Sequence, residues 1–217
     1  MEQDDRKCIS LRNISKNYKE KIIFNDLSYD FYFNTCYLLQ GESGIGKSTL
    51  LNIIAGYEDV DSGVIIRSND NMIQYMFQDS MLFSNLTVME NIAIKYYANS
   101  EITNWNIEEL QKELSVILEK FKIKDLINRK VHKLSGGERQ RVALAGMMLI
   151  DSSILLLDEP VSNIDPENRK EIINMINEYS SGKVVIIATH DDMPGIKNEV
   201  QIKLRNGKIY EKKNDSN

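Results

Sequence analysis

The sequence predicts an α/β protein built on a mostly parallel sheet, and two observations lead to this prediction. Residues 154–157 and 184–188 are continuous apolar runs, which are typical of central strands buried on both faces. A glycine-rich loop at 41–48 lies between a short apolar run at 36–39 and a segment of helical spacing at 48–55. A strand, a glycine loop and a helix in this order favour a core that binds phosphate groups.

The other elements follow from the spacing of apolar residues along the chain. A helical stripe of apolar residues predicts one amphipathic helix over 108–121, and Gly56 is expected to end the helix at 48–55. Near the C-terminus, Asn206-Gly207 is a preferred turn of a two-residue β-hairpin, here spanning 200–210. The remaining predicted strands, most of them in an N-terminal β region, cover residues 8–14, 22–24, 27–33, 64–66 and 72–77.

Composition narrows the class of protein. The 217 residues fit one domain with lobes or two small domains. A net charge of −5 argues against a nucleic-acid partner, which would need a basic surface. The acidic start does not resemble a signal peptide, and no apolar run is long enough to span a membrane. Two widely spaced cysteines, Cys8 and Cys36, do not suggest a disulfide framework. We therefore expect a cytoplasmic protein that reaches a membrane only through a partner.

The loop Gly41-Glu-Ser-Gly-Ile-Gly46-Lys47-Ser48 matches the phosphate-binding pattern G-x-x-x-x-G-K-[ST] in full. Its glycines allow backbone N–H groups to approach the α- and β-phosphates of a nucleotide, and the N-terminus of the next helix adds its positive dipole. Lys47 is expected to reach the β- and γ-phosphates, with its head exposed when no nucleotide is bound. Ser48 is expected to offer its hydroxyl to magnesium. The alternative is a glycine-rich turn that binds nothing.

Asp158 and Glu159 directly follow the apolar run 154–157. Ligands of open parallel sheets collect at the edge where the strands end. Asp158 is therefore expected to hold magnesium through water, and Glu159 to polarise the water that attacks a phosphate. The alternative is an acidic pair that only caps the following segment.

Ser135-Gly136-Gly137-Glu138 has the pattern of a helix capping box, with a serine N-cap and a glutamate three residues later. The box accounts for the serine and the glutamate. It does not account for two adjacent glycines, which weaken a helix start by about 0.5–1 kcal/mol each. We expect these glycines to allow close approach of the backbone to an anion, and a purely structural capping box is the alternative.

In identity and order, these motifs resemble the ATP-binding cassette (ABC) family over about residues 8–207. The resemblance implies that the chain binds ATP and Mg²⁺. It also implies that Ser135, Gly136 and Gly137 bind the γ-phosphate held by the opposite subunit of a dimer. The residues expected around the nucleotide itself are Gly41, Glu42, Ser43, Gly44, Ile45, Gly46, Lys47, Ser48 and Thr49.

Three further residues receive roles through this resemblance. His190 resembles the family's switch histidine, which contacts the γ-phosphate and belongs to the catalytic set with Glu159. Gln78 resembles the glutamine that senses the γ-phosphate and magnesium, and Tyr18 resembles the aromatic residue that stacks on adenine. The respective alternatives are a structural histidine, a polar strand end and a half-buried strand tyrosine.

The resemblance implies a P-loop NTPase core with an N-terminal antiparallel β lobe and an inserted helical lobe at about 80–150. The whole chain, 1–217, is expected to be one domain, with an ordered cassette at about 8–210 and a solvated tail at 211–217. The implied function is ATP hydrolysis by the motor subunit of an ABC membrane transporter. Two such subunits would close around two ATP molecules and drive an integral membrane permease from the cytoplasmic face.

Finer expectations concern the type of transporter. The chain's size and residues 133–144 resemble the small ATPases of lipoprotein-release, peptide-export and bacteriocin-export systems, so we expect an exporter. A soluble machine, such as an iron–sulfur cluster assembly ATPase, is the alternative function. The apolar residues of segment 81–88 are interpreted as part of a groove for a helix of the permease, and ordinary core packing is the alternative. They are Met81, Leu82, Phe83, Leu86 and Val88.

Overall fold

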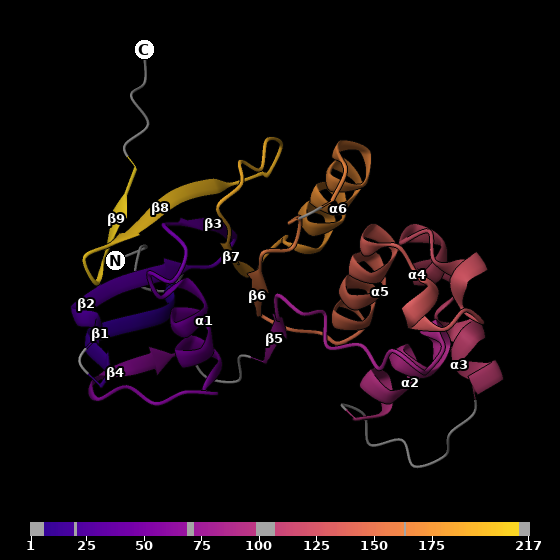
Figure 1. Ribbon diagram of the computed structural model, residues 1–217, viewed down its shortest axis with the longest axis horizontal. Helices are drawn as coiled ribbons and strands as arrows, with labels where there is room; N and C mark the ends of the chain where they lie inside the picture. Colours follow the sequence, from indigo (N-terminus) through magenta and orange to yellow (C-terminus); the bar gives the residue numbers. More distant parts are fainter. Residues whose placement is uncertain (1–6, 20, 69–71, 99–106, 163, 213–217) are drawn as a thin grey trace.

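Figure 1 shows a computed structural model of the chain, which describes residues 7–19, 21–68, 72–98, 107–162 and 164–212. The N-terminal region forms an antiparallel sheet with the strand order β2-β1-β4. The two strands predicted at 22–24 and 27–33 form one strand, β2, which ends at Tyr32, because Asp26, at φ 50°, bends β2 without ending it. The strands of this sheet are β1 (Lys7–Tyr18), β2 (Lys21–Tyr32) and β4 (Ser62–Arg67).

The second sheet has six strands in the order β5-β6-β7-β3-β8-β9 and is parallel except for its last pair. Its C-terminal hairpin turns at Asn206 and Gly207, whose φ angles of 50° and 70° suit the tight turn predicted there. The sequence's prediction of an α/β fold with a mostly parallel sheet is therefore confirmed. The strands are β3 (Thr35–Gln40), β5 (Ile73–Met76), β6 (Ile154–Asp158), β7 (Val184–Ala188), β8 (Glu199–Arg205) and β9 (Lys208–Glu211).

Side chains of the central strands alternate between two hydrophobic clusters. In β6, Ile154 and Leu156 join the cluster that contains helix α1 (Lys47–Ala55), whereas Leu155 and Leu157 join the cluster of the other helices. Successive side chains of a strand point to opposite faces, so a strand buried on both faces needs the continuous apolar run that the sequence contains. Helix α1 ends at Gly56, which is left-handed at φ 79°, as expected.

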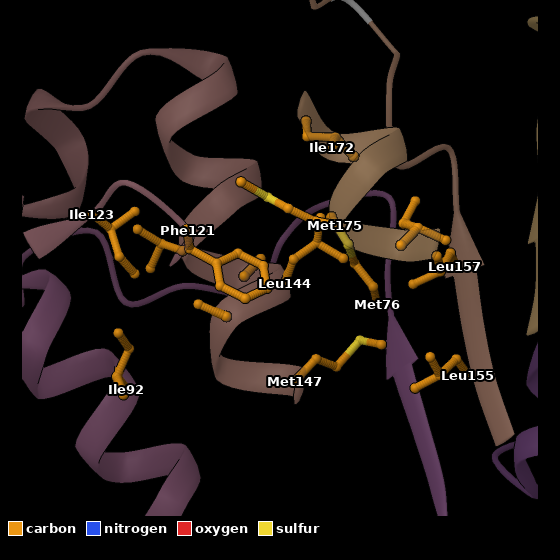
Figure 2. Packing of buried hydrophobic residues seen from close by; sticks show 14 of the residues in the cluster. Met76, Ile92, Phe121, Ile123, Leu144, Met147, Leu155, Leu157, Ile172 and Met175 are labelled. Atoms are coloured by element: carbon orange, nitrogen blue, oxygen red, sulfur yellow. The ribbon is translucent and has the colours of Figure 1, made fainter. Parts of the chain in front are cut away.

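The second cluster joins the sheet to a group of helices, drawn on the right of Figure 1. In Figure 2, Leu144 and Met147 lie between Phe121 and the strand residues Met76 and Leu155. This packing connects the helical region to the strands that carry the candidate site. The helices are α2 (Val88–Ala98), α3 (Ile107–Glu113), α4 (Ser115–Lys120), α5 (Gly136–Met148) and α6 (Pro166–Tyr179), with short 3-10 turns at Lys124–Leu126 and Val131–Lys133.

The prediction of one helix over 108–121 is wrong in its continuity, because the segment divides into α3 and α4 at Leu114. Leu114 has φ −85° and ψ 0°, and the residues after it, Ser115 and Val116, are weak helix formers. The hydrogen bonds from Leu114 N to Leu110 O (2.8 Å) and from Leu118 N to Leu114 O (2.9 Å) nevertheless persist. The predicted apolar stripe therefore keeps its helical period, and its residues are buried except Ile117, which is partly buried.

Helix α6 is an element that the sequence interpretation misses. The Asp165 side chain accepts a hydrogen bond from Asn168 N (3.1 Å) as its N-cap, and Pro166 begins the helix. The division into one domain with a helical lobe stays a prediction. Of the expected tail, Glu211 belongs to β9, and residues 213–217 lie outside the described part of the chain. Within the described residues, no helix has both the length and the apolar character that crossing a membrane requires.

Candidate functional site

Most of the predicted site residues meet in a cleft of about 730 Å³ at the carboxyl edge of the parallel sheet. Strand β3 leads into the glycine loop, β6 ends at Asp158, and His190 comes two residues after β7. These three strands are neighbours in the sheet, so the chain leaves all three of them at the same edge. The lining residues are Tyr18, Lys21, Ile23, Gly41, Glu42, Ser43, Gly44, Gly46, Lys47, Ser48, Thr49, Gln78, Asp158, Glu159 and His190.

The glycine loop has a conformation that larger residues would disturb. Gly46 stands at φ 113° as the N-cap of α1, and a Cβ atom there would lie 2.5 Å from Ile23 Cγ2. Gly44 is also left-handed, at φ 70°. The loop therefore keeps its backbone close to the cleft at the start of a helix, which is the arrangement that binds phosphate.

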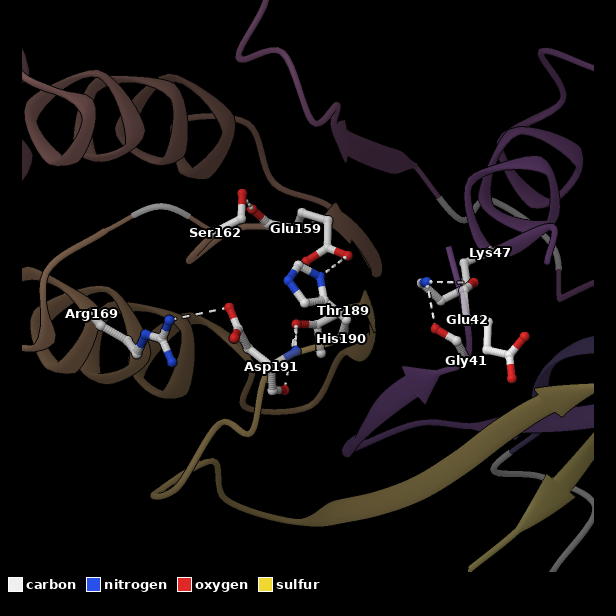
Figure 3. A network of polar contacts seen from close by, with 9 residues as sticks. All are labelled: Gly41, Glu42, Lys47, Glu159, Ser162, Arg169, Thr189, His190 and Asp191. Atoms are coloured by element: carbon white, nitrogen blue, oxygen red, sulfur yellow. Dashed lines mark hydrogen bonds and ion pairs between the residues drawn. The ribbon is translucent and has the colours of Figure 1, made fainter. Parts of the chain in front are cut away.

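Lys47 corrects one expectation. Its side chain is buried rather than exposed, and its Nζ donates to Gly41 O (2.8 Å) and Glu42 O (3.3 Å), as drawn in Figure 3. A buried ammonium group needs hydrogen-bond partners, and the carbonyl groups of its own loop supply them. The cation is thereby held inside the loop, on the side of the cleft.

Two carboxylates are buried at the end of β6. Asp158 is 4% exposed and Glu159 is 7% exposed. Burial raises the pKa of Asp158, while a hydrogen bond from Ser48 and the charge of Lys47 act in the opposite direction. Glu159 is left-handed at φ 51°, a conformation that costs energy for a residue with a Cβ and that is often kept at functional sites.

These residues fit a magnesium ion that would be shared with nucleotide phosphates. Glu159 Oε2 is buried and has no hydrogen-bond partner among the described residues, so it is an acceptor ready for a water molecule. Ser48 and Asp158 both line the cleft, and Ser48 acts to lower the pKa of Asp158. The described residues hold no group of three or more histidine, cysteine or acidic side chains that could bind a metal alone. A hydroxyl and one carboxylate, completed by phosphate oxygens and water, suit Mg²⁺.

His190 contacts the buried carboxylate directly. Its Nδ1 lies 2.8 Å from Glu159 Oε1, and its own side chain is 63% exposed (Figure 3). The hydrogen bond to Glu159 is the main cause that raises the pKa of His190, and the charge of the same carboxylate adds to it. Protonated His190 therefore forms an ion pair with Glu159 at the mouth of the cleft.

This ion pair predicts a pH dependence in the nucleotide-free protein. Because the pKa of His190 is higher in the folded chain than its ordinary value of about 6.5, the pair contributes its full stability below that pH and loses it as the pH rises through the folded value. In an NMR titration, His190 should titrate above its ordinary value, and Glu159→Gln should bring the pKa down. An unchanged pKa in Glu159→Gln would show that the carboxylate does not control this histidine.

A second ion pair supports the loop that carries His190. Arg169 on α6 lies 3.1 Å from Asp191 Oδ2, and Asp191 N donates to Thr189 Oγ1 (3.0 Å). Thr189 is fully buried, and its backbone N–H donates to Leu39 O of β3 (3.1 Å). Helix α6 and the end of β7 thus fix the backbone around His190, as Figure 3 shows.

The predicted capping box exists, but it lies away from the cleft. Ser135 Oγ accepts from Glu138 N (3.2 Å), and Glu138 Oε2 accepts from Ser135 N (2.7 Å). Packing explains why residue 137 is glycine, because a Cβ atom there would lie 3.0 Å from Asn168 Cγ. Gly136 has no described neighbour within 4 Å of such an atom and is exposed, so packing does not account for it.

Of the other predicted residues, two line the cleft and one does not. Gln78 and Tyr18 line the cleft, and both are exposed. Ile45 is not among the described lining residues and packs against the cluster that contains α1. Sequence interpretation misses Lys21, whose Nζ donates to Gly44 O of the glycine loop (2.9 Å). Its position could be inferred from strand pairing, because Lys21 pairs with Tyr18, a predicted site residue, across the β1–β2 hairpin.

Comparison with known proteins agrees with this site. A family model described as ABC transporter matches residues 24–162. The thiamine import ATP-binding protein ThiQ of Histophilus somni is 39% identical over 184 residues, which cover 79% of this chain and 84% of that protein. The sulfate/thiosulfate import ATP-binding protein CysA of Mannheimia succiniciproducens is 34% identical over 194 residues, which cover 84% of this chain. The matched region is 54% of CysA, so the chain spans about half the length of that relative.

Solved structures show the same relationship. The dimeric structure of MJ0796, a bacterial ABC transporter cassette, has a TM-score of 0.82 at 28% identity, covering 94% of this chain and 98% of that one. Both relatives named above are import proteins, so the expectation of an export-type subunit is not supported. The chain belongs to the ABC transporter family, as an ATP-binding subunit of the kind that hydrolyses ATP to drive transport.

Proposed function

We propose that the chain is the motor subunit of an ABC importer of a small polar solute, attached to an integral membrane permease at the cytoplasmic face of a membrane. The observation that carries the proposal is the convergence of the glycine loop, Asp158, Glu159 and His190 on one cleft. The proposed direction of transport, import, rests on relatives that are named for import of thiamine, sulfate/thiosulfate and spermidine/putrescine. None of these relatives favours the alternative of a soluble iron–sulfur assembly ATPase.

The main residues of the cleft each have a role in this proposal. The N–H groups of the glycine loop and Lys47 hold the phosphates, and Tyr18 stacks on the base. Ser48 and Asp158, with Gln78 nearby, would hold magnesium, which supplies charge neutralisation at the phosphates when bound. Glu159 accepts the proton of the attacking water. His190 holds the Glu159 carboxylate in position and faces the γ-phosphate.

The working unit in this proposal is a dimer. Ser135 and Gly136 are exposed at the N-terminus of α5, and neither lines the cleft of its own chain as far as the described residues go. Exposed donors at the start of a helix of 13 residues suit an anion that another molecule brings. We therefore infer that residues 135–137 bind the γ-phosphate in the cleft of a second copy. The dimeric structures of the cassette MJ0796 support a dimer as the working unit.

The contact with the permease is proposed at a separate groove of about 390 Å³ between β5, α2 and α5. Met81 and Phe83 line it and are 71% and 57% exposed, which is unusual for large apolar side chains. Leu82 also lines the groove, whereas Val88 is fully buried in the core. Of the five apolar residues in segment 81–88, three thus line the groove and Val88 belongs to the core. Leu86 is half-buried and lies outside the groove lining.

The dimer is tested by mixing two inactive variants. Ser135→Arg should block hydrolysis, because its side chain fills the space that the opposite γ-phosphate needs. Lys47→Ala should sharply weaken nucleotide binding in its own cleft. If residues 135–137 act on the other subunit, a mixed dimer carries both lesions in one site and none in the other. The 1:1 mixture should therefore regain ATPase activity above that of either variant alone.

The controls separate function from folding. Arginine also removes the N-cap, which costs about 1 kcal/mol, whereas Ser135→Asp keeps a capping side chain and still places a negative charge against the phosphate. Both variants should fail alone and both should be rescued by Lys47→Ala chains. A mixture that stays inactive, with helix content preserved, would show that residues 135–137 do not act across the interface.

A further inference from the structure

A cluster of polar side chains holds the Tyr18 ring from outside the cleft. The Tyr18 hydroxyl donates to Glu58 Oε1, and Lys16 Nζ lies 3.0 Å from the same carboxylate oxygen. Lys16 Nζ also lies 5.3 Å from the centre of the Tyr18 ring. The side chains of Lys16 and Glu58 are only 12% and 19% exposed, so this contact is partly shielded from water.

Further hydrogen bonds attach the end of β1 to the loop that follows α1. Lys16 Nζ donates to Asp59 O (2.7 Å), and Asn17 donates to Asp61 Oδ2 through its backbone N (2.7 Å) and its Nδ2 (3.1 Å). Helix α1 begins at the glycine loop. The tyrosine and the phosphate-binding loop are thus connected through one helix, from its first residue to the loop after its last.

The tyrosine itself has little else to hold it. Tyr18 is 44% exposed, and among the described residues its hydroxyl hydrogen-bonds Glu58. Neither Lys16 nor Glu58 is among the described residues that line the cleft, whereas Tyr18 is. An effect of Glu58 on a nucleotide would therefore pass through the tyrosine.

We propose that Glu58 is a positioning residue for nucleotide binding, which orients the Tyr18 ring through its hydroxyl while Lys16 balances the Glu58 charge. The inference rests on the proposed stacking of Tyr18 on the base. A ring fixed before the ligand arrives loses less conformational freedom on binding, so the orientation raises affinity without a contact of its own. Glu58 therefore contributes to the affinity for the base of the nucleotide and not to the affinity for its phosphates.

Calorimetry of the full chain with ATP tests this inference. Glu58→Ala should weaken ATP binding about three- to tenfold, the effect of one hydrogen bond. Tyr18→Phe keeps the ring and removes the hydroxyl, so it should weaken binding by a similar factor. Because both changes remove the same contact, the double variant Glu58→Ala with Tyr18→Phe should bind ATP no more weakly than either single variant.

Three controls accompany these variants. Asp59→Ala removes the same charge from the same loop, but Asp59 contacts Lys16 through its backbone carbonyl, so ATP affinity should not change. Glu58→Gln keeps an acceptor for the hydroxyl and should restore most of the affinity. Inorganic triphosphate has no base, so its affinity should be equal in wild type and Glu58→Ala, which a general loosening of the loop would not allow.

The possible results separate this inference from the proposed stacking. If Tyr18→Ala leaves ATP affinity unchanged, the stacking itself is wrong. If Tyr18→Ala weakens binding but Glu58→Ala does not, the stacking stands and the role of Glu58 is wrong. Additive losses in the double variant, or an equal loss of triphosphate affinity, would show that Glu58 acts on the fold and not through the Tyr18 hydroxyl.

Discussion

Glu159→Gln should keep ATP binding and lower the turnover rate by about two to four powers of ten. The amide has the shape of the carboxylate and preserves an acceptor for His190, which lies 2.8 Å from Glu159 Oε1. It cannot accept a proton from the attacking water. The side chain is buried, so no bulk water replaces this function, and its unpaired Oε2 marks the position for the water in question.

Turnover and ATP affinity are measured separately to check this expectation. Because the phosphate-binding residues are intact, the variant should also accumulate as an ATP-dependent dimer in gel filtration. Glu167→Gln makes the same chemical change on an exposed residue of α6 and should hydrolyse ATP at the wild-type rate. A near wild-type rate in Glu159→Gln would mean that another group takes the proton.

The parts of this molecule that sequence predicts best are those with one dominant physical cause. Continuous apolar runs predict β6 and β7, because strands buried on both faces cannot carry polar side chains. The Asn206-Gly207 turn and the capping box at Ser135 are equally predictable, since each depends on a few local hydrogen bonds or φ angles.

The features that the sequence does not predict depend on contacts between distant residues. The pairing of Arg169 with Asp191 and of Tyr18 with Glu58 joins segments that only the fold brings together. The break at Leu114 occurs inside an unbroken apolar period, so periodicity cannot reveal it. The motif places Lys47 in the site, but its burial against Gly41 O results from the shape of the loop.

Lys47→Ala should reduce ATP affinity about ten- to hundredfold, as expected for the loss of charge-assisted hydrogen bonds to phosphate. The buried Lys47 ammonium group is held on Gly41 O and Glu42 O inside the loop, so a cation is already present beside the place where phosphates would bind. The two carbonyl groups border a cleft, so water can satisfy them in the variant. The fold should therefore survive, with little change in melting temperature.

Lys21→Ala is the matched comparison, because Lys21 also donates to a carbonyl of the glycine loop, Gly44 O at 2.9 Å. Lys21 is exposed, so its charge is screened by water and its loss should lower ATP affinity far less than the loss of Lys47.

Calorimetry with ATP on both variants tests whether the buried lysine binds the phosphates. Equal affinities in the two variants would mean that burial does not distinguish Lys47, and wild-type affinity in Lys47→Ala would remove it from the phosphate site. A large drop confined to Lys47→Ala, at unchanged melting temperature, would show that the buried cation acts on the ligand and not on the fold.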